Sequence, residues 1–165
     1  MTSFPNEMIE KASQAGGTIV LPEGDDDRIV RAAKQLVEDG IVEKVFVLGS
    51  SAHFEQSNIE IVNPEEDRDV DELAHSLANS SDDMTLSEAE KTVVQPLFYG
   101  AAMVEKGEAD GMVAGAANPT ANVLRAALNM IGTKPESSVV SSSFVMEVDD
   151  TSFGQEGRLL FTDPA

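Results

Sequence analysis

Residues 110–125 read Asp110-Gly-Met-Val-Ala-Gly-Ala-Ala-Asn-Pro-Thr-Ala-Asn-Val-Leu-Arg125. This order predicts a buried strand, a tight loop of small residues and a helix. The apolar run from Met112 to Ala114 suits the strand, while Asn118 and Pro119 suit the N-cap and the first position of the helix. Strand–loop–helix units of this kind build α/β proteins with a parallel sheet.

The same junction is a candidate anion site. A loop that leads into a helix gathers free backbone N–H groups beside the positive end of the helix dipole. Arg125 follows Asn118 by seven residues, which places it on nearly the same helix face, about 10 Å along the axis. We expect its guanidinium to reach a phosphate held at the loop. The alternative is an ordinary turn, since most such turns carry no ligand.

The rest of the chain continues this alternation of strands and helices. Helical spacing and end signals predict helices at Met8–Ala15, Ile29–Val37, Val70–Leu77, Leu86–Val94 and Leu97–Lys106. Short β-branched runs predict strands at Thr18–Leu21, Lys44–Leu48 and Ile59–Val62, and near Val139-Val140 and Leu159–Phe161. The predicted fold is therefore α/β, a parallel sheet flanked by helices, with the start of a second α/β domain at the C-terminal end.

Local signals set several boundaries within this pattern. Thr85 and Glu88 have the spacing of a capping box, and Pro96 is expected in the first turn of the helix that follows it. Gly132 and Pro135 break the helix that carries Arg125. The predicted domains are residues 1–133, an N-terminal α/β domain, and residues 134–165, the incomplete beginning of a second one.

The chain is strongly acidic. Thirty Asp and Glu residues against eleven Lys and Arg give a formal net charge of −19. Such a surface opposes nucleic-acid binding, which needs basic patches. It is typical of proteins from a high-salt cytoplasm, where a Debye length of about 3 Å at 1 M salt screens self-repulsion. Disorder is the alternative interpretation, but 41% hydrophobic residues argue against it.

Several other site classes are excluded or disfavoured. There are no cysteines, hence no disulfide and no thiolate metal site. His53 and His75 have no partner at metal-ligand spacing, and we expect both at the surface. No apolar run approaches 18 residues and the first residues lack signal-peptide character, so no membrane association and a cytoplasmic location are expected.

One acidic loop, Glu23-Gly-Asp-Asp-Asp-Arg28, follows the first predicted strand. It lies at the carboxyl edge of the sheet, where open α/β folds place ligands. Its acidity disfavours phosphate, and Asp25 or Asp26 is expected to serve as a helix N-cap. No direct catalytic role is expected for this loop.

Several segments, in order along the chain, resemble the phosphate acetyl/butyryl transferase family. They are Ile19–Arg28, Pro96–Val104, the stretch from Asp110 through Pro135, Val139–Met146 and Gly157–Asp163. The chain departs from the family pattern at Asn118-Pro119, where His-Ser or Ser-Ser is common, and at Ala126, where proline is usual. A further family arginine, expected before Thr85, has no counterpart in Ser76–Ser80.

The resemblance implies transfer of an acetyl group between phosphate and coenzyme A, by direct attack of the coenzyme A thiolate on the acyl carbonyl. Coenzyme A and acetyl phosphate would be substrates, with no resident cofactor and no metal. Arg125 is the residue expected to act in catalysis, with Asn118 and Thr120 binding substrate at the loop. Ser141 and Ser143, predicted on one side of a strand, are either small packing residues or hydrogen-bond donors to the substrate.

Family members are about twice this length, and their reactive serine, an arginine and an aspartate lie in the C-terminal half. We therefore expect this chain to correspond to an N-terminal half with little or no activity alone. It could form a homodimer or pair with a C-terminal half. The alternatives are a non-catalytic half that binds acyl phosphate, and a regulatory acyltransferase-like domain such as that of malic enzymes, whose other portion is absent here.

Overall fold

The structure, a computed structural model, describes residues 3–49, 54–67, 69–80, 84–137 and 139–162. Two compact units make up the chain. One unit comprises residues 11–132, which we call the sheet unit, and the other combines residues 1–10 with 133–165, which we call the hairpin unit. The predicted domains, 1–133 and 134–165, stay a prediction.

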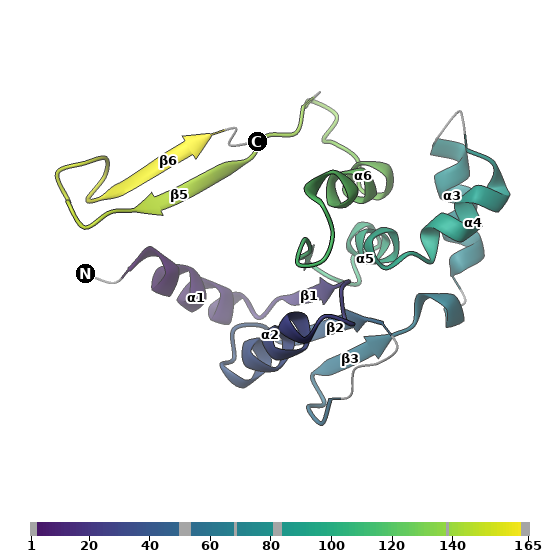
Figure 1. Cartoon of the computed structure of the whole chain (residues 1–165), viewed down its shortest axis with the longest axis horizontal. Coiled ribbons are helices and arrows are strands. Elements are labelled where there is room, and N and C mark those ends of the chain that lie inside the picture. The colour runs from purple at the N-terminus through teal and green to yellow at the C-terminus, as the bar shows by residue number, and fades with distance from the viewer. Residues whose placement is uncertain (1–2, 50–53, 68, 81–83, 138, 163–165) are drawn as a thin grey trace. The chain divides into compact units, whose positions relative to one another are not determined.

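The sheet unit contains a parallel sheet in the order β3-β2-β1-β4, of which β1, β2 and β3 are labelled in Figure 1. Its strands are β1 Thr18–Leu21, β2 Lys44–Leu48, β3 Ile59–Val62 and β4 Gly111–Met112. Val20 of β1 pairs with Phe46 on one side and with Met112 on the other. The prediction of an α/β fold with a parallel sheet is confirmed, although β4 begins and ends earlier than the apolar run suggested.

Helices precede, connect and follow these strands along the chain. They are α1 Phe4–Ala15, which spans both units, α2 Asp27–Glu38, the 3-10 turn η1 Pro64–Glu66, α3 Val70–Ser80, α4 Leu86–Val93, α5 Pro96–Glu105 and α6 Thr120–Met130. The Thr85–Glu88 capping box forms as predicted, and Pro96 occupies the first turn of α5. The first helix begins at Phe4, earlier than predicted, since Pro5 suits a first helical turn.

The two faces of the sheet carry separate apolar clusters, because alternate strand residues point to opposite sides. Val20 and Leu48 pack with α3 to α6 on one face. Leu21, Val45 and Val47 pack with α2 on the other. Together the two clusters make up the buried apolar core of the sheet unit.

Helix α5 lies close against the sheet at Gly100. A methyl group at this position would lie 3.1 Å from the sulfur of Met112 and 3.4 Å from Cδ1 of Leu48. A larger side chain would therefore push α5 away from β1 and β4.

The hairpin unit contains two antiparallel strands, β5 Ser143–Glu147 and β6 Arg158–Thr162, with Phe144 opposite Phe161. The strand predicted near Val139-Val140 starts later, at Ser143, and both valines lie outside the strands and are exposed. The strand predicted near Leu159–Phe161 lies within β6. Ser143 is the first residue with a partner on β6, and this pairing sets where the strand begins.

Candidate functional site

The loop between β1 and α2 places one carboxylate inside the protein. Glu23 follows β1 directly after Pro22 and is only 7% exposed. Gly24 keeps this loop tight against β2, since a Cβ there would lie 2.5 Å from the Leu48 carbonyl oxygen. The side chain of Glu23 is thereby directed to the loop between β4 and α6.

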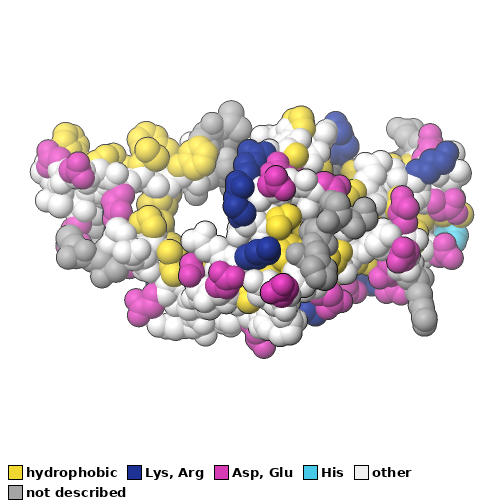
Figure 2. Space-filling model, turned by 60° about the horizontal axis from the view of Figure 1, so that its bottom comes forward, with side chains coloured by type: hydrophobic (Ala, Val, Ile, Leu, Met, Phe, Trp, Pro, Cys, Tyr) yellow, Lys and Arg dark blue, Asp and Glu magenta, His cyan; other side chains and the backbone are white. Residues whose placement is uncertain are grey.

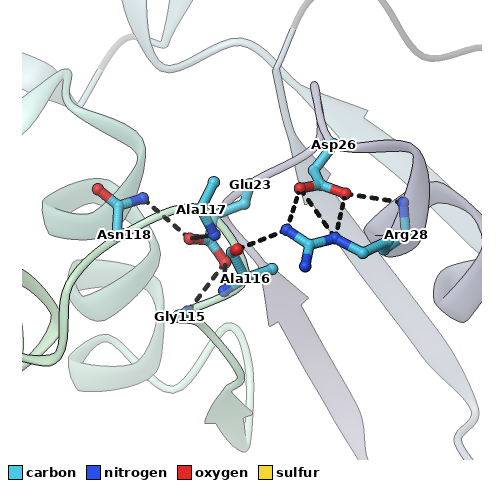
Figure 3. Close-up of polar contacts among 7 residues, drawn as sticks. All are labelled: Glu23, Asp26, Arg28, Gly115, Ala116, Ala117 and Asn118. Atoms are coloured by element: carbon cyan, nitrogen blue, oxygen red, sulfur yellow. Dashed lines mark hydrogen bonds and ion pairs between the residues drawn. The ribbon is translucent and has the colours of Figure 1, made fainter.

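That second loop surrounds the Glu23 carboxylate with donors (Figure 3). Oε2 accepts hydrogen bonds from the backbone N–H groups of Gly115 at 2.9 Å and Ala116 at 2.8 Å. Oε1 accepts from the N–H of Ala117 at 2.8 Å and from Nδ2 of Asn118 at 2.9 Å. Gly115 has φ of 111°, a left-handed value that turns the successive N–H groups toward one point.

The ionised form of Glu23 is favoured by these contacts. Burial alone would raise the pKa of its carboxyl group, but the hydrogen bonds from Asn118, Ala117, Ala116 and Gly115 bring that pKa below its ordinary value. Near neutral pH the loop therefore holds a full negative charge that belongs to the protein itself.

The prediction that Asn118 is the N-cap of the helix was wrong. Helix α6 begins at Thr120 with Pro119 as its N-cap residue, and no side chain caps it. Asn118 is drawn instead to Glu23, because a hydrogen bond to a buried carboxylate is stronger than one to an exposed helix end.

Arg28 links the β1–α2 loop to the β4–α6 loop through side-chain hydrogen bonds. Asp26 is the N-cap of α2, as predicted, and accepts from the backbone N–H of Arg28 at 2.8 Å. The Arg28 guanidinium also binds Asp26, with Nη2 2.6 Å from Oδ2, and donates to the Ala116 carbonyl oxygen at 2.5 Å. Hydrogen bonds from Arg28 lower the pKa of Asp26 to about 2. The Ala116 peptides are thus held on both their N–H and their C=O sides.

Arg125 lies on the exposed surface of α6. Its Nη1 donates to Oδ1 of Asn122, 3.1 Å away and one turn nearer the helix start. The N–H groups of Thr120 and Ala121, in the first turn, have no acceptor among the residues that the structure describes. The side chain therefore slants toward this first turn, as its position on the helix requires.

Ser141 and Ser143 belong to the hairpin unit, and both are exposed. Ser143 opens β5, whereas Ser141 precedes the strand. The predicted shared strand face is therefore wrong for Ser141, since β5 begins only where pairing with β6 begins.

A cavity of about 470 Å³ opens beside the Glu23 contacts. Its lining comes from the β1–α2 loop, the start of α5 and the β4–α6 loop, and consists of Pro22, Glu23, Gly24, Asp25, Asp26, Gln95, Pro96, Leu97, Ala117 and Asn118. Three of these side chains are acidic and none is basic. The negative lining disfavours a phosphate deep in this cavity.

Acidic side chains are scattered widely over the molecular face in Figure 2. No trio of His, Cys, Asp or Glu among the described residues is arranged to hold a metal ion. His75 is exposed on α3, and His53 lies outside the described residues. Within the described part, the helices are too short or too polar to cross a membrane.

Reasoning from the sequence missed Glu23. The total charge of the acidic loop disfavours phosphate, but it does not show that Glu23, unlike Asp25, is buried. A signal was present: Glu23 stands alone directly after a strand and Pro22, two residues before the run of aspartates. Side chains at the carboxyl end of a parallel strand face the neighbouring loops.

Comparisons with protein families and with individual relatives identify the same family. The family model for phosphate acetyl/butaryl transferase matches residues 3–165. The phosphate acetyltransferase of Acetivibrio thermocellus is 39% identical over 171 residues, which covers 98% of this chain and 51% of the relative. That of Corynebacterium glutamicum is 38% identical over 154 residues, with 87% and 46% covered.

A solved structure agrees. The crystal structure of a phosphotransacetylase from Streptococcus pyogenes superposes with a TM-score of 0.84 at 33% identity, covering 99% of this chain and 52% of that one. The chain thus spans about half the length of the relatives it matches. It belongs to the phosphate acetyl/butaryl transferase family.

Proposed function

We propose that this chain supplies one side of a phosphate acetyltransferase site, which moves an acetyl group between phosphate and coenzyme A. Family membership carries this proposal, and the first turn of α6 supports it. The free N–H groups of Thr120 and Ala121, with the Arg125 guanidinium, form a favourable place for a phosphoryl group.

In the forward reaction the sulfur of coenzyme A attacks the carbonyl carbon of acetyl phosphate. A C–S bond forms, the C–O bond to phosphate breaks, and the thiol proton passes to a base. Arg125 and the first-turn N–H groups stabilise the negative charge on the departing phosphate. Asn118 contributes its amide oxygen as an acceptor for substrate, because its Nδ2 is already bound to Glu23. The base comes from the part of the family's length that this chain does not span.

The substrates are accordingly acetyl phosphate and coenzyme A, with no resident cofactor. Ser141 and Ser143 are proposed as hydrogen-bond donors to substrate, on the resemblance alone. We place the protein in the cytoplasm, and its net charge of −19 supports a cytoplasm rich in salt.

A second candidate function is pairing with another chain, either a copy or a C-terminal half. The observation that favours it is the hairpin, whose apolar side chains are exposed on both faces: Phe144 is 59%, Leu160 65% and Phe161 53% exposed. Strands with two apolar faces are typical of sheets covered on both sides. A regulatory acyltransferase-like domain has no comparable support.

A transfer assay tests the first proposal. Acetyl phosphate and coenzyme A are supplied in low and in molar KCl to three samples: the chain alone, the chain mixed with the C-terminal half of the Acetivibrio thermocellus relative, and the two fused. We expect little or no thioester from the chain alone and turnover from the fusion. Turnover by the chain alone would contradict the assignment of the base to the other half.

The Arg125→Gln fusion should then lose roughly 100-fold or more in rate. The matched control is Arg31→Gln, which neutralises an exposed arginine on α2. Equal rates for the two variants would remove Arg125 from the mechanism.

A further inference from the structure

The β4–α6 loop has the form of an anion site that is already occupied. Three successive N–H groups, from Gly115, Ala116 and Ala117, converge on one point, as in the backbone concavities that bind phosphate in other proteins. The point is filled by the carboxylate of Glu23, which is almost completely buried. We propose that Glu23 is an internal anion that closes this loop to phosphate and holds the start of α6 in place.

The N–H donors of this loop are already engaged by Glu23, so they are not available to a second anion. An ionised carboxylate accepts about four hydrogen bonds, and Glu23 receives four, three from backbone and one from Asn118. A phosphate could use the same N–H groups only after Glu23 had left. Asp25 and Asp26 line the adjoining cavity, so an arriving phosphate would also meet like charge.

The contacts also explain how the loop acquires a fixed shape. Glu23 holds the N–H side of residues 115–117, and Arg28 holds the carbonyl oxygen of Ala116. Asn118, the last residue that Glu23 binds, lies just before the Pro119 N-cap of α6. The first turn of α6 and Arg125 therefore take their place from Glu23, which makes it a positioning residue rather than a catalytic one.

The inference is tested on this chain, without an activity assay. Amide resonances of Gly115, Ala116 and Ala117 are followed by NMR during a titration with inorganic phosphate. In the wild-type chain we expect them not to move, because the site is full. If these three resonances shift in the wild-type chain, the site is open and the proposal is overturned.

Removal of the carboxylate should open the site. In Glu23→Ala, hydrogen exchange of the three amides should accelerate roughly tenfold or more. Added formate should slow it again, and added phosphate should now shift their resonances. Rescue by a free carboxylate separates loss of the anion from a general loss of packing. Fast exchange that formate leaves unchanged, or exchange that remains slow, would each overturn the proposal.

Two further variants complete the design. Glu90→Ala removes an exposed carboxylate from α4 and should leave the three amides unchanged. Should Glu23→Ala fail to fold, Glu23→Gln serves instead, because it retains the size of the side chain but replaces one acceptor oxygen with a donor NH2 group. Protection from hydrogen exchange should then fall at the backbone N–H groups that face this nitrogen. Unchanged protection at all three N–H groups in Glu23→Gln would count against the proposal.

Discussion

The two units of this chain use similar strands in opposite ways. In the sheet unit β1 and β2 are short, largely apolar runs whose side chains pack into clusters on both faces of the sheet, while β3 buries Ile59 and leaves Ile61 exposed. In the hairpin unit the apolar residues of β5 and β6 are mostly exposed. Among the described residues, every buried hydrophobic side chain lies between Val20 and Ala126. An apolar strand therefore contributes to stability only where other elements cover it, and a two-stranded hairpin alone is marginal.

The two units also differ in how deeply their charged side chains are buried. In the sheet unit, Glu23 is buried and satisfied by four donors. In the hairpin unit, Arg158 binds Glu7, with Nη2 2.5 Å from Oε1, and lies 3.6 Å from Glu147, all at partly exposed side chains. Water competes for these pairs, so we expect them to contribute much less to stability.

The largest expected difference is in packing. Leu48→Ala in β2 removes a side chain that is 1% exposed, and should destabilise the sheet unit by about 2–5 kcal/mol. Leu160→Ala, at 65% exposed, should change the hairpin unit by less than about 0.5 kcal/mol. Urea unfolding, followed through amide resonances of each unit, measures both. Equal losses would show that the hairpin is covered in solution.

A smaller difference is expected for the carboxylates. Glu23→Gln leaves buried N–H donors without their anion and should destabilise the sheet unit by about 1–3 kcal/mol. Glu147→Gln weakens a contact with Arg158 and the backbone N–H of Phe4, and should cost less than about 1 kcal/mol. The same unfolding measurement applies. A greater cost for Glu147→Gln would reverse the comparison.

The smallest effect is on acid stability. The pKa values of Glu23 and Asp26 lie below their ordinary values of 4.5 and 3.8 in the folded chain. Each therefore stabilises the fold fully above its ordinary pKa, and that contribution is lost as the pH falls through the folded pKa, about 2 for Asp26. The difference in unfolding free energy between wild type and Asp26→Asn should narrow from pH 4.5 toward 2. A difference that stays constant over this range would show that the Asp26 pKa is not lowered.

Local patterns predicted much of the sheet unit. Strands β1, β2 and β3 match their predicted bounds, because β-branched runs bounded by Gly or Pro leave few alternatives. Asp26 and the Thr85 capping box were also predictable, since a cap bonds within three residues of itself.

Two of the errors arise from contacts between residues distant in the sequence. The sequence predicts Asn118 as a helix cap, but its partner Glu23 lies 95 residues earlier in the chain. Val139-Val140 has β propensity, yet β5 starts at Ser143, where Thr162 provides a partner. Neither contact leaves a periodic signal in the sequence. The resemblance identified the family, but the occupied loop becomes visible only in three dimensions.

One titration tests the central claim, that substrate phosphate binds the first turn of α6 and not the loop before it. Inorganic phosphate is added to the wild-type chain, and backbone amides together with the Arg125 guanidinium are followed by NMR. The account predicts shifts at Thr120, Ala121 and Arg125, with Gly115 to Ala117 unmoved. Shifts at Gly115 to Ala117, with Thr120, Ala121 and Arg125 unchanged, would contradict it.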